Sequence, residues 1–256
     1  MTERSRSEIF YATRSPVNQP ARVPGLSVFL PSHNEEANVE RVVRGYLAAL
    51  PRFAQVYEVI VVNDGSDDRT GEIAERLAAA DSHVRVVHHP VNRGYGDAVS
   101  SGIRAAKLPY VVLSDGDGQF DPDELGKLVA FVPEYDVVVG RRIHRADHLV
   151  RKLNGEAWTL LVRTLLGVGI HDIDCGFKLF KREFLDRIEL RARGAMISTE
   201  LMTRLVGLGA RVREVEVTHL PRLAGEQSGA NLKVVARAFK ELFTLYGDLR
   251  REAKKD

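Results

Sequence analysis

The first half of the chain alternates short apolar runs with segments whose apolar residues recur at helical spacing. Apolar runs bounded by turn residues predict buried strands, and the i, i+3, i+4 spacing predicts helices between them. The predicted strands cover residues 26–30, 57–63, 84–89, 110–115 and 136–142, and the predicted helices cover 34–50, 67–80, 95–106 and a segment after Pro122. Apolar strands that alternate with helices are typical of an α/β fold, in which helices cover both faces of a mostly parallel, Rossmann-like sheet.

The second half is less regular. Helical spacing predicts helices over residues 149–167, 181–190 and 199–208. Period-two alternation over 211–220 predicts a strand with one face in water.

The same pattern predicts the domain organisation. Residues 1–24 are polar and contain four arginines and three prolines, so we expect a flexible N-terminal arm. Residues 25–231 are expected to form one domain, and 232–256 an amphipathic C-terminal helix. From residue 233 onward that helix carries seven Lys or Arg against four Asp or Glu. Packing on its own domain is its usual role, and peripheral contact with a membrane is the alternative.

Composition narrows the class of protein. The 256 residues are 44% hydrophobic, enough for a real core, and the net charge of only +2 argues against a dedicated nucleic-acid binder. The single cysteine, Cys175, excludes an internal disulfide and fits a reducing compartment. No secretory signal is visible, and no run approaches the roughly 20 apolar residues that span a bilayer. We therefore expect a cytoplasmic protein, with peripheral contact at the inner membrane face as the alternative.

Polar clusters follow four of the predicted strands, at residues 31–36, 63–68, 92–96 and 115–119. In a parallel sheet, ligands bind beyond the carboxyl ends of the strands, and these ends meet at one edge. Four clusters on the same edge are more than turns require, so the sequence predicts a ligand site there.

The acidic run after the fourth strand has two interpretations. Asp115 and Asp117 either form a polar turn or face a divalent cation, because two carboxylates two residues apart on a turn can both reach one ion or its waters. A calcium loop starting at Asp115 would need glycine and glutamate where the chain has Phe120 and Gly126, so that kind of site is excluded. The residues alone leave the turn and the Mg²⁺ or Mn²⁺ site open.

Two other features are interpreted structurally. The Gly94-Tyr95-Gly96 stretch lacks one glycine of a dinucleotide-binding fingerprint and follows the third strand, so we interpret it as tight helix packing. Cys175 is expected to be a small packing residue rather than a nucleophile.

Eight short motifs occur in one order between about residues 26 and 230: LPSHNEE, VVNDGSDDRT, NRGYGDA, LSDGDGQFDPDE, VGRR, DIDCGFKLF, ISTEL and LPRLAGEQSG. Together they resemble the family 2 glycosyltransferases of GT-A fold, and within them the polyprenol- and dolichol-phosphate sugar synthases. The resemblance implies inverting transfer of a sugar from a nucleotide diphosphate sugar to a polyprenyl phosphate, dependent on Mg²⁺ or Mn²⁺.

The resemblance also implies roles for the residues at matching positions. The implied metal-facing groups are Asp115, Asp117 and Gln119. The implied contacts with the nucleotide sugar are Pro31, His33, Glu35, Val62, Asp64, Asp115, Gly116, Arg142 and Arg222. The implied catalytic groups are Asp117, Arg142, Asp174, Glu200 and Arg222, and the implied acceptor contacts are Arg151 and Asp172. Because a phosphate acceptor is already ionised, Asp174 and Glu200 can be positioning groups rather than general bases.

Three alternatives remain open. The weakest is a nucleotidyltransferase, which also handles nucleotide diphosphates on an α/β sheet but would release pyrophosphate rather than a nucleoside diphosphate. The acceptor can instead be a soluble glycoside or a natural-product intermediate. The protein can also be a regulator that binds a nucleotide sugar without catalysis, rather than an enzyme. The presence of Asp115, Asp117, Gln119 and Arg222 argues against this alternative.

Overall fold

The computed structural model describes residues 10–11, 22–143, 169–194, 196–222 and a few residues between 241 and 251. The predicted helix over 149–167, the residue Arg151 and most of the predicted C-terminal helix lie outside this part of the chain. The domain boundaries therefore stay predictions. Among the described residues, no helix is both long and apolar enough to cross a membrane.

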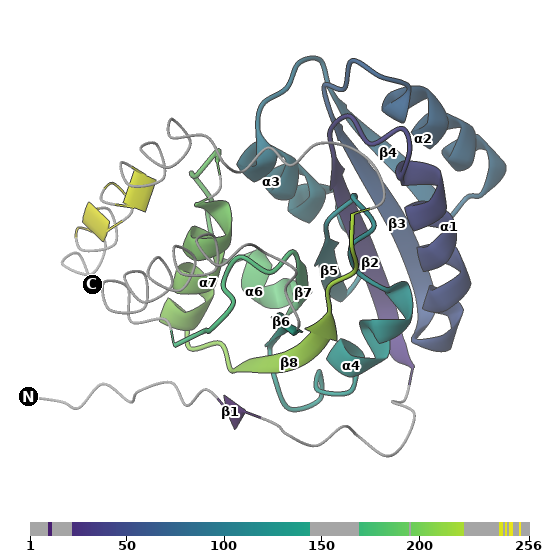
Figure 1. Cartoon of the computed structure of the whole chain (residues 1–256). Helices are drawn as coiled ribbons and strands as arrows, with labels where there is room; N and C mark the ends of the chain where they lie inside the picture. Colours follow the sequence, from purple (N-terminus) through teal and green to yellow (C-terminus); the bar gives the residue numbers. More distant parts are fainter. Residues whose placement is uncertain are drawn as a thin grey trace, which may run out of the picture.

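The described strands form one eight-stranded sheet in the order β1-β8-β6-β7-β5-β2-β3-β4 (Figure 1). Their bounds are Phe10–Tyr11 (β1), Val23–Ser32 (β2), Ala54–Asp64 (β3), Val84–His89 (β4), Tyr110–Ser114 (β5), Val137–Ile143 (β6), Phe177–Lys181 (β7) and Val212–Thr218 (β8). β7 runs antiparallel to both of its neighbours, and the other paired strands are parallel. The predicted mostly parallel α/β sheet is confirmed, and β1, from the predicted N-terminal arm, extends it at the β8 edge.

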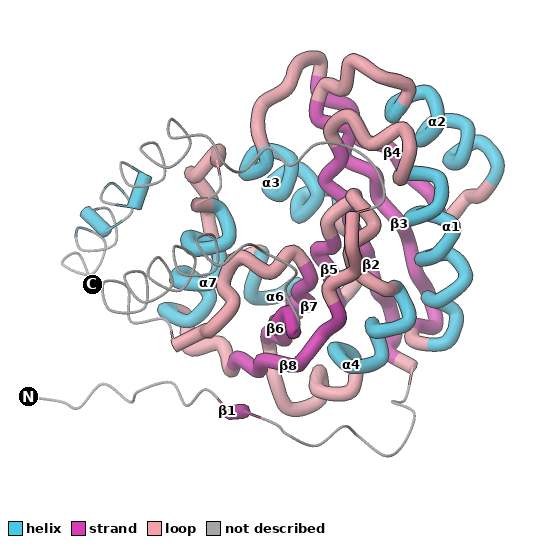
Figure 2. The backbone as a smooth tube through the Cα atoms, viewed as in Figure 1, coloured by secondary structure: helices cyan, strands magenta, loops and turns pink. Residues whose placement is uncertain are grey.

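Helices cover both faces of the sheet (Figure 2). One face packs against α1 (Val39–Ala49), α2 (Thr70–Ala80) and α4 (Leu125–Val129), and the other against α3 (Tyr95–Ala105), α6 (Arg182–Leu185) and α7 (Ile197–Gly207). Two 3-10 turns, Leu50–Arg52 and Pro122–Glu124, follow α1 and precede α4.

Alternate residues of β2 enter opposite cores. Val28 and Leu30 belong to the hydrophobic cluster beneath α1, α2 and α4, whereas Phe29 belongs to the cluster beneath α3, α6 and α7. All three side chains are fully buried. Burial on both faces explains why this strand is a continuous apolar run rather than an alternating one.

The sequence pattern missed β7. Its second residue, Lys178, interrupts the apolar run, so the pattern predicted no strand before the helix expected over 181–190. That helix is present but shorter, as α6. In the structure the Lys178 side chain is fully buried. Its Nζ donates to the backbone carbonyl of Cys175 and to Ser198 Oγ, at 3.3 Å in the second case. Burial lowers the pKa of Lys178. Two acceptors inside the fold let a lysine occupy a position that the pattern treats as polar surface.

The first helix begins at Val39 rather than at residue 34. Asn34 has a φ of 56°, a left-handed conformation that asparagine adopts more readily than most residues. The first polar cluster is therefore a loop at the edge of the sheet, and its side chains and backbone are available for contacts outside a helix.

Packing at one helical glycine yields a prediction about stability. A Cβ on Gly102 of α3 would lie 2.1 Å from the Phe29 ring, whereas a Cβ on Gly207, the last residue of α7, would meet nothing within 4 Å. We expect Gly102→Ala to lower the free energy of unfolding by about 2 kcal/mol through overpacking. The matched Gly207→Ala should raise it by roughly 0.5 kcal/mol, the ordinary helix propensity gain. Urea unfolding measures both, and shifts of the same sign would contradict this account of α3 packing.

Candidate active site

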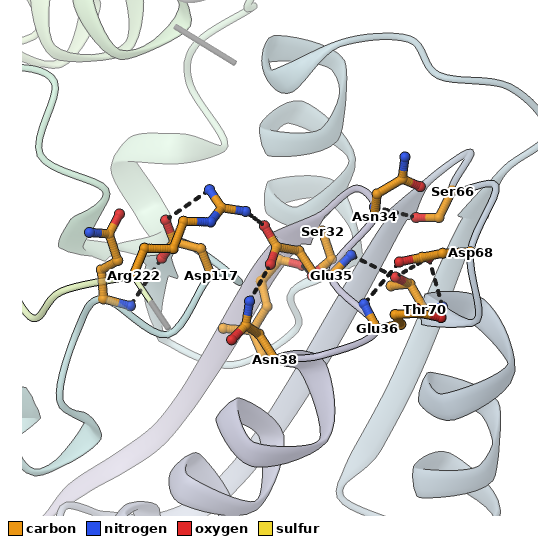
Figure 3. A network of polar contacts seen from close by, with 12 residues as sticks. Ser32, Asn34, Glu35, Glu36, Asn38, Ser66, Asp68, Thr70, Asp117 and Arg222 are labelled. Atoms are coloured by element: carbon orange, nitrogen blue, oxygen red, sulfur yellow. Dashed lines mark hydrogen bonds and ion pairs between the residues drawn. The ribbon is translucent and has the colours of Figure 1, made fainter. Parts of the chain in front are cut away.

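Two loops at the carboxyl ends of β2 and β3 are joined by hydrogen bonds between backbone and side chains. The backbone N–H of Asn34 donates to Ser66 Oγ at 3.0 Å, and that of Glu35 donates to Thr70 Oγ1 at 2.8 Å (Figure 3). Short hydroxyl side chains satisfy loop backbone groups in this way. The first two polar clusters are thus brought together, as the sheet topology predicted.

Arg222 lies between Glu35 and Asp117, although it comes from a distant part of the chain (Figure 3). Its Nη2 donates to Glu35 Oε1, and its Nη1 lies 3.8 Å from Asp117 Oδ2, beyond hydrogen-bonding distance. The other Glu35 oxygen accepts from Asn38 Nδ2 at 2.7 Å. The side chains of Glu35, Asp117 and Arg222 are at most 18% exposed. The structure therefore places a guanidinium between two carboxylates in a partly dry environment.

Gln119 connects the acidic run to the segment that carries Arg222. Its Nε2 donates to the carbonyl of Leu220 at 3.0 Å, and the N–H of Leu220 donates to the carbonyl of Gln119 at 2.8 Å. The backbone N–H of Gln119 also donates to Asp117 Oδ1 at 3.0 Å. The side-chain amide thus positions the 220–222 segment, and a role in facing a metal stays a prediction.

Asp117 is held in an environment that disfavours its charge. Burial raises the pKa of its carboxyl to about 6, and the neighbouring charge of Asp115 acts in the same direction. The Arg222 guanidinium partly opposes this increase. Two carboxylates that repel each other in a partly buried site are stabilised by a bound cation.

Asp115 is held from two sides. Its Oδ1 accepts a hydrogen bond from the Tyr95 hydroxyl at 2.8 Å, and its backbone N–H donates to the Gly176 carbonyl at 3.2 Å. The carboxylate rests on Gly176, because a Cβ there would lie 1.9 Å from Asp115 Oδ2. Burial raises the pKa of Tyr95 well above its ordinary value, so the hydroxyl keeps its proton and acts as the donor. This contact was not predicted, because the Gly94-Tyr95-Gly96 stretch was interpreted as helix packing. The hydroxyl of a tyrosine in a polar cluster at a strand end was the available signal.

The donor groups fit a cation that also binds a substrate. The described residues contain no group of three or more His, Cys, Asp or Glu side chains arranged to hold a metal ion. Asp115 and Asp117 supply two carboxylates. Mg²⁺ is usually bound by one or two carboxylates together with substrate phosphates and waters, rather than by an all-protein cage. The two aspartates therefore fit Mg²⁺ or the similar Mn²⁺ when a diphosphate provides the other ligands.

Asp64 makes its described contacts within the protein. Its carboxylate accepts from His89 Nδ1 at 2.6 Å, from the N–H of Arg93 at 2.9 Å and from the N–H of Gly94 at 2.8 Å. The residue is only 3% exposed. The carboxylate thus holds the third polar cluster against the end of β3. The implied contact with a nucleoside stays a prediction.

The other residues implied on the nucleotide side surround the ends of β2 and β3. His33 is exposed, and its Nδ1 lies 3.0 Å from the Asp64 carbonyl, so this nitrogen carries the proton. Pro31 and Val62 are buried. Gly116 donates its N–H to the Pro31 carbonyl at 3.3 Å, and a Cβ there would lie 2.8 Å from that same oxygen. Close packing against β2 explains the glycine in this structure.

Arg142, predicted to contact the nucleotide sugar, and Asp172, predicted to contact the acceptor, bind each other. Arg142 Nε and Nη2 donate to the two carboxylate oxygens at 2.8 and 2.7 Å, and the Arg142 N–H adds a third bond at 3.0 Å. Both side chains are largely buried, at 12% and 10% exposed. Hydrogen bonds to Asp172 raise the pKa of Arg142 despite burial, which by itself would lower that pKa. The two predicted site residues form one ion pair at the end of β6.

Glu200 is buried in the first turn of α7 and serves as an acceptor for neighbouring groups. One oxygen accepts from the N–H of Arg191 at 2.9 Å and of Ala192 at 2.7 Å, and the other from Arg204 Nε at 2.8 Å. Asp174 is exposed. Cys175 is fully buried, and burial raises the pKa of its thiol to about 12, as expected of a packing residue.

The unfavourable environment of Asp117 predicts a gain in stability when its charge is removed. The folded chain binds the carboxyl proton more tightly than the unfolded chain, so wild-type stability falls as the pH rises from about 4 to about 6. Asp117→Asn should therefore increase the free energy of unfolding by on the order of 2 kcal/mol at neutral pH, and by much less near pH 4. Urea unfolding at both pH values measures the difference. If Asp117→Asn is no more stable than the wild type at neutral pH, the folded structure does not disfavour the charge on Asp117.

Comparison with known proteins agrees with this arrangement. Residues 27–189 match Glycosyl transferase family 2. Polyprenol monophosphomannose synthase of Mycolicibacterium smegmatis is 35% identical over 225 residues, which cover 80% of this chain and 82% of that protein. Glycosyltransferase AglD of Haloferax volcanii is 36% identical over 219 residues, which cover 82% of this chain but only 35% of AglD.

A solved structure shows the same fold. Glucosyl-3-phosphoglycerate synthase from Mycobacterium tuberculosis, in complex with Mn²⁺, UDP-glucose and glycerol 3-phosphate, superposes with a TM-score of 0.71. It is 23% identical, and the match covers 93% of this chain and 88% of that one. The family match covers more than half of the chain, and the mannose synthase resembles the chain along most of the length of both proteins. The chain therefore belongs to glycosyl transferase family 2 and has its GT-A fold.

Proposed function

We propose that this protein transfers a sugar from a nucleoside diphosphate sugar to a polyprenyl phosphate, with the help of a divalent cation. The observation that carries the proposal is the meeting of Asp115, Asp117 and Arg222 at the carboxyl edge of the sheet. Two carboxylates and a guanidinium provide what a diphosphate leaving group requires, a cation site and a positive side chain.

The names of the relatives support the acceptor. The polyprenol monophosphomannose synthase matches this chain along most of both lengths. Undecaprenyl-phosphate 4-deoxy-4-formamido-L-arabinose transferases of Pectobacterium and Pseudomonas are 28% and 29% identical over more than 200 residues, which cover 65% of their length. Each of these names contains a polyprenyl phosphate or its product, which favours a lipid phosphate acceptor here.

The reaction exchanges one C–O bond for another. An oxygen of the acceptor phosphate attacks the anomeric carbon and forms the new C–O bond. The bond from that carbon to the diphosphate breaks on the opposite face, and the nucleoside diphosphate leaves with the electron pair. An acceptor phosphate is already ionised, so the step requires no general base. Glu200 supports this scheme, because both of its oxygens bind protein donors.

The side chains have distinct roles in this scheme. Asp115 and Asp117 hold the cation, which neutralises charge on the diphosphate when bound. Arg222 supplies a positive charge beside the leaving group, and its hydrogen bond to Glu35 keeps the guanidinium at the site. The buried pair of Arg142 and Asp172 presents a fixed arginine on the acceptor side, where phosphate binding competes with the carboxylate for its donors. Arg151 is a further acceptor contact in this proposal.

Two aspartates in the same acidic run give a matched test. Asp117 faces Arg222, whereas Asp121 is exposed and its carboxylate accepts from the N–H of Asp123, at 3.0 Å. With labelled UDP- or GDP-sugars, polyprenyl phosphate and Mn²⁺, we expect label to enter the organic phase. Asp117→Asn should reduce this transfer by about 100-fold or more, since even outer partners of metal ligands are worth 10–100-fold. Asp121→Asn should change it by less than about 2-fold, because asparagine also caps a helical turn.

Each other outcome has a definite meaning. If label enters only a soluble glycoside or phosphorylated acceptor, the lipid acceptor is wrong and the transferase assignment stands. Equal losses in the two variants would remove Asp117 from its assigned role. Hydrolysis of the donor without any transfer to an acceptor would contradict the proposal.

A further inference from the structure

Tyr95 connects the third polar cluster to the proposed cation site. It is the first residue of α3, and its half-buried side chain donates the hydroxyl hydrogen to Asp115 Oδ1 at 2.8 Å. A phenol that donates to one oxygen of a carboxylate restricts how that carboxylate can rotate. The contact matters because Asp115 is one of the two carboxylates in the proposed site.

The backbone on either side of Tyr95 is itself fixed. The N–H of Gly94 donates to Asp64 at the end of β3, at 2.8 Å, and the N–H of Gly96 donates to the Arg193 carbonyl at 2.9 Å. A Cβ on Gly96 would lie within 2.8 Å of Arg193 backbone atoms, so the two segments approach as closely as glycine permits. The backbone that carries Tyr95 into the site is therefore held on both sides by hydrogen bonds.

The segment that holds Gly96 is in turn held by α7. Glu200, which is only 1% exposed, accepts from the N–H groups of Arg191 and Ala192, directly before Arg193. A buried carboxylate that binds two backbone donors fixes the course of that segment. An unbroken series of contacts thus runs from Glu200 through residues 191–193 and the start of α3 to the Tyr95 hydroxyl.

A second support reaches Asp115 from the same helix turn. Lys178 Nζ donates to the Cys175 carbonyl and to Ser198 Oγ, and Ser198 lies two residues before Glu200 in the first turn of α7. These bonds fix the backbone beside Gly176, on which the Asp115 carboxylate rests. Both supports of Asp115 therefore begin at the same turn of α7.

We propose that Tyr95 is a positioning residue for the divalent cation: its hydroxyl orients the Asp115 carboxylate that binds the ion. The inference rests on the proposed function, because it assumes that Asp115 holds a cation. Outer partners that orient metal-binding carboxylates typically contribute 10–100-fold in affinity. The Tyr95 hydroxyl donates directly to the carboxylate proposed to hold the ion, so its effect should appear in cation binding itself.

The chain offers a matched control. Tyr46 of α1 is fully buried and donates its hydroxyl to Ser114 Oγ at 2.6 Å, one residue before Asp115 and from the opposite face of the sheet. Tyr95→Phe and Tyr46→Phe each delete one hydroxyl and keep the ring. Only the first removes a hydrogen bond from the proposed cation site.

The experiment is a Mn²⁺ titration of the full chain in the presence of UDP or GDP, followed by the electron paramagnetic resonance signal of free Mn²⁺. Tyr95→Phe should weaken Mn²⁺ binding by roughly 10–100-fold. Tyr46→Phe should leave it within about 2-fold of the wild type, because the hydroxyl that it loses is bonded to Ser114 and not to a carboxylate of the site. Thermal unfolding without metal shows whether both variants remain folded.

The outcomes separate this inference from the proposed function. If the wild type binds Mn²⁺ and Tyr95→Phe binds it equally well, the positioning role is wrong and the proposed cation site stands. If both variants weaken binding equally, general loosening explains the effect and the inference also fails. If the wild type binds no Mn²⁺ with either nucleotide, the cation part of the proposed function is wrong, and the role of Tyr95 falls with it.

Discussion

The mutual repulsion of Asp115 and Asp117 is the constraint around which the candidate site is arranged. Their carboxylates lie two residues apart in the sequence, directly after β5, and are partly removed from water, which raises the pKa of Asp117. Such a pair is tolerated only when donors and cations surround it. Tyr95 donates to one carboxylate and Arg222 approaches the other. The segments that carry Tyr95 and Arg222 are therefore placed so that these side chains stabilise the two charges.

The antiparallel strand β7 is the part of the fold that makes this arrangement possible. It lies between β5 and β6 in the sheet, so the turn before it reaches the carboxyl end of β5. Gly176 in that turn lacks a side chain where the Asp115 carboxylate lies. The buried Lys178 then ties this turn to α7. A strand that interrupts the parallel order thus supplies the surface on which one proposed metal ligand rests.

The strands and the edge where the site lies could be predicted, because apolar run length and turn residues are local properties of a sequence. β7 could not, since the acceptors that let Lys178 lie inside the fold come from other segments. The partners of the polar residues were equally hidden. Asp64 and Glu200 stand at the positions that the family pattern marks, yet their oxygens bind backbone N–H groups from segments distant in sequence or beyond a turn. Motifs locate such residues, and only tertiary contacts show which of them support others.

The placement of Arg222 links the ligand-free site to the proposed reaction. Its guanidinium forms a hydrogen bond with Glu35, but only a 3.8 Å ion pair with Asp117. A cation bound to Asp117 would replace Arg222 as the partner of that carboxylate and leave the hydrogen bond between Arg222 and Glu35 intact. The arginine would then remain at the site while its positive charge becomes available to the diphosphate, whose negative charge increases as the sugar departs. In the proposed reaction Glu35 would keep the arginine at the site, which would explain why a buried glutamate stands beside a site proposed to bind a diphosphate.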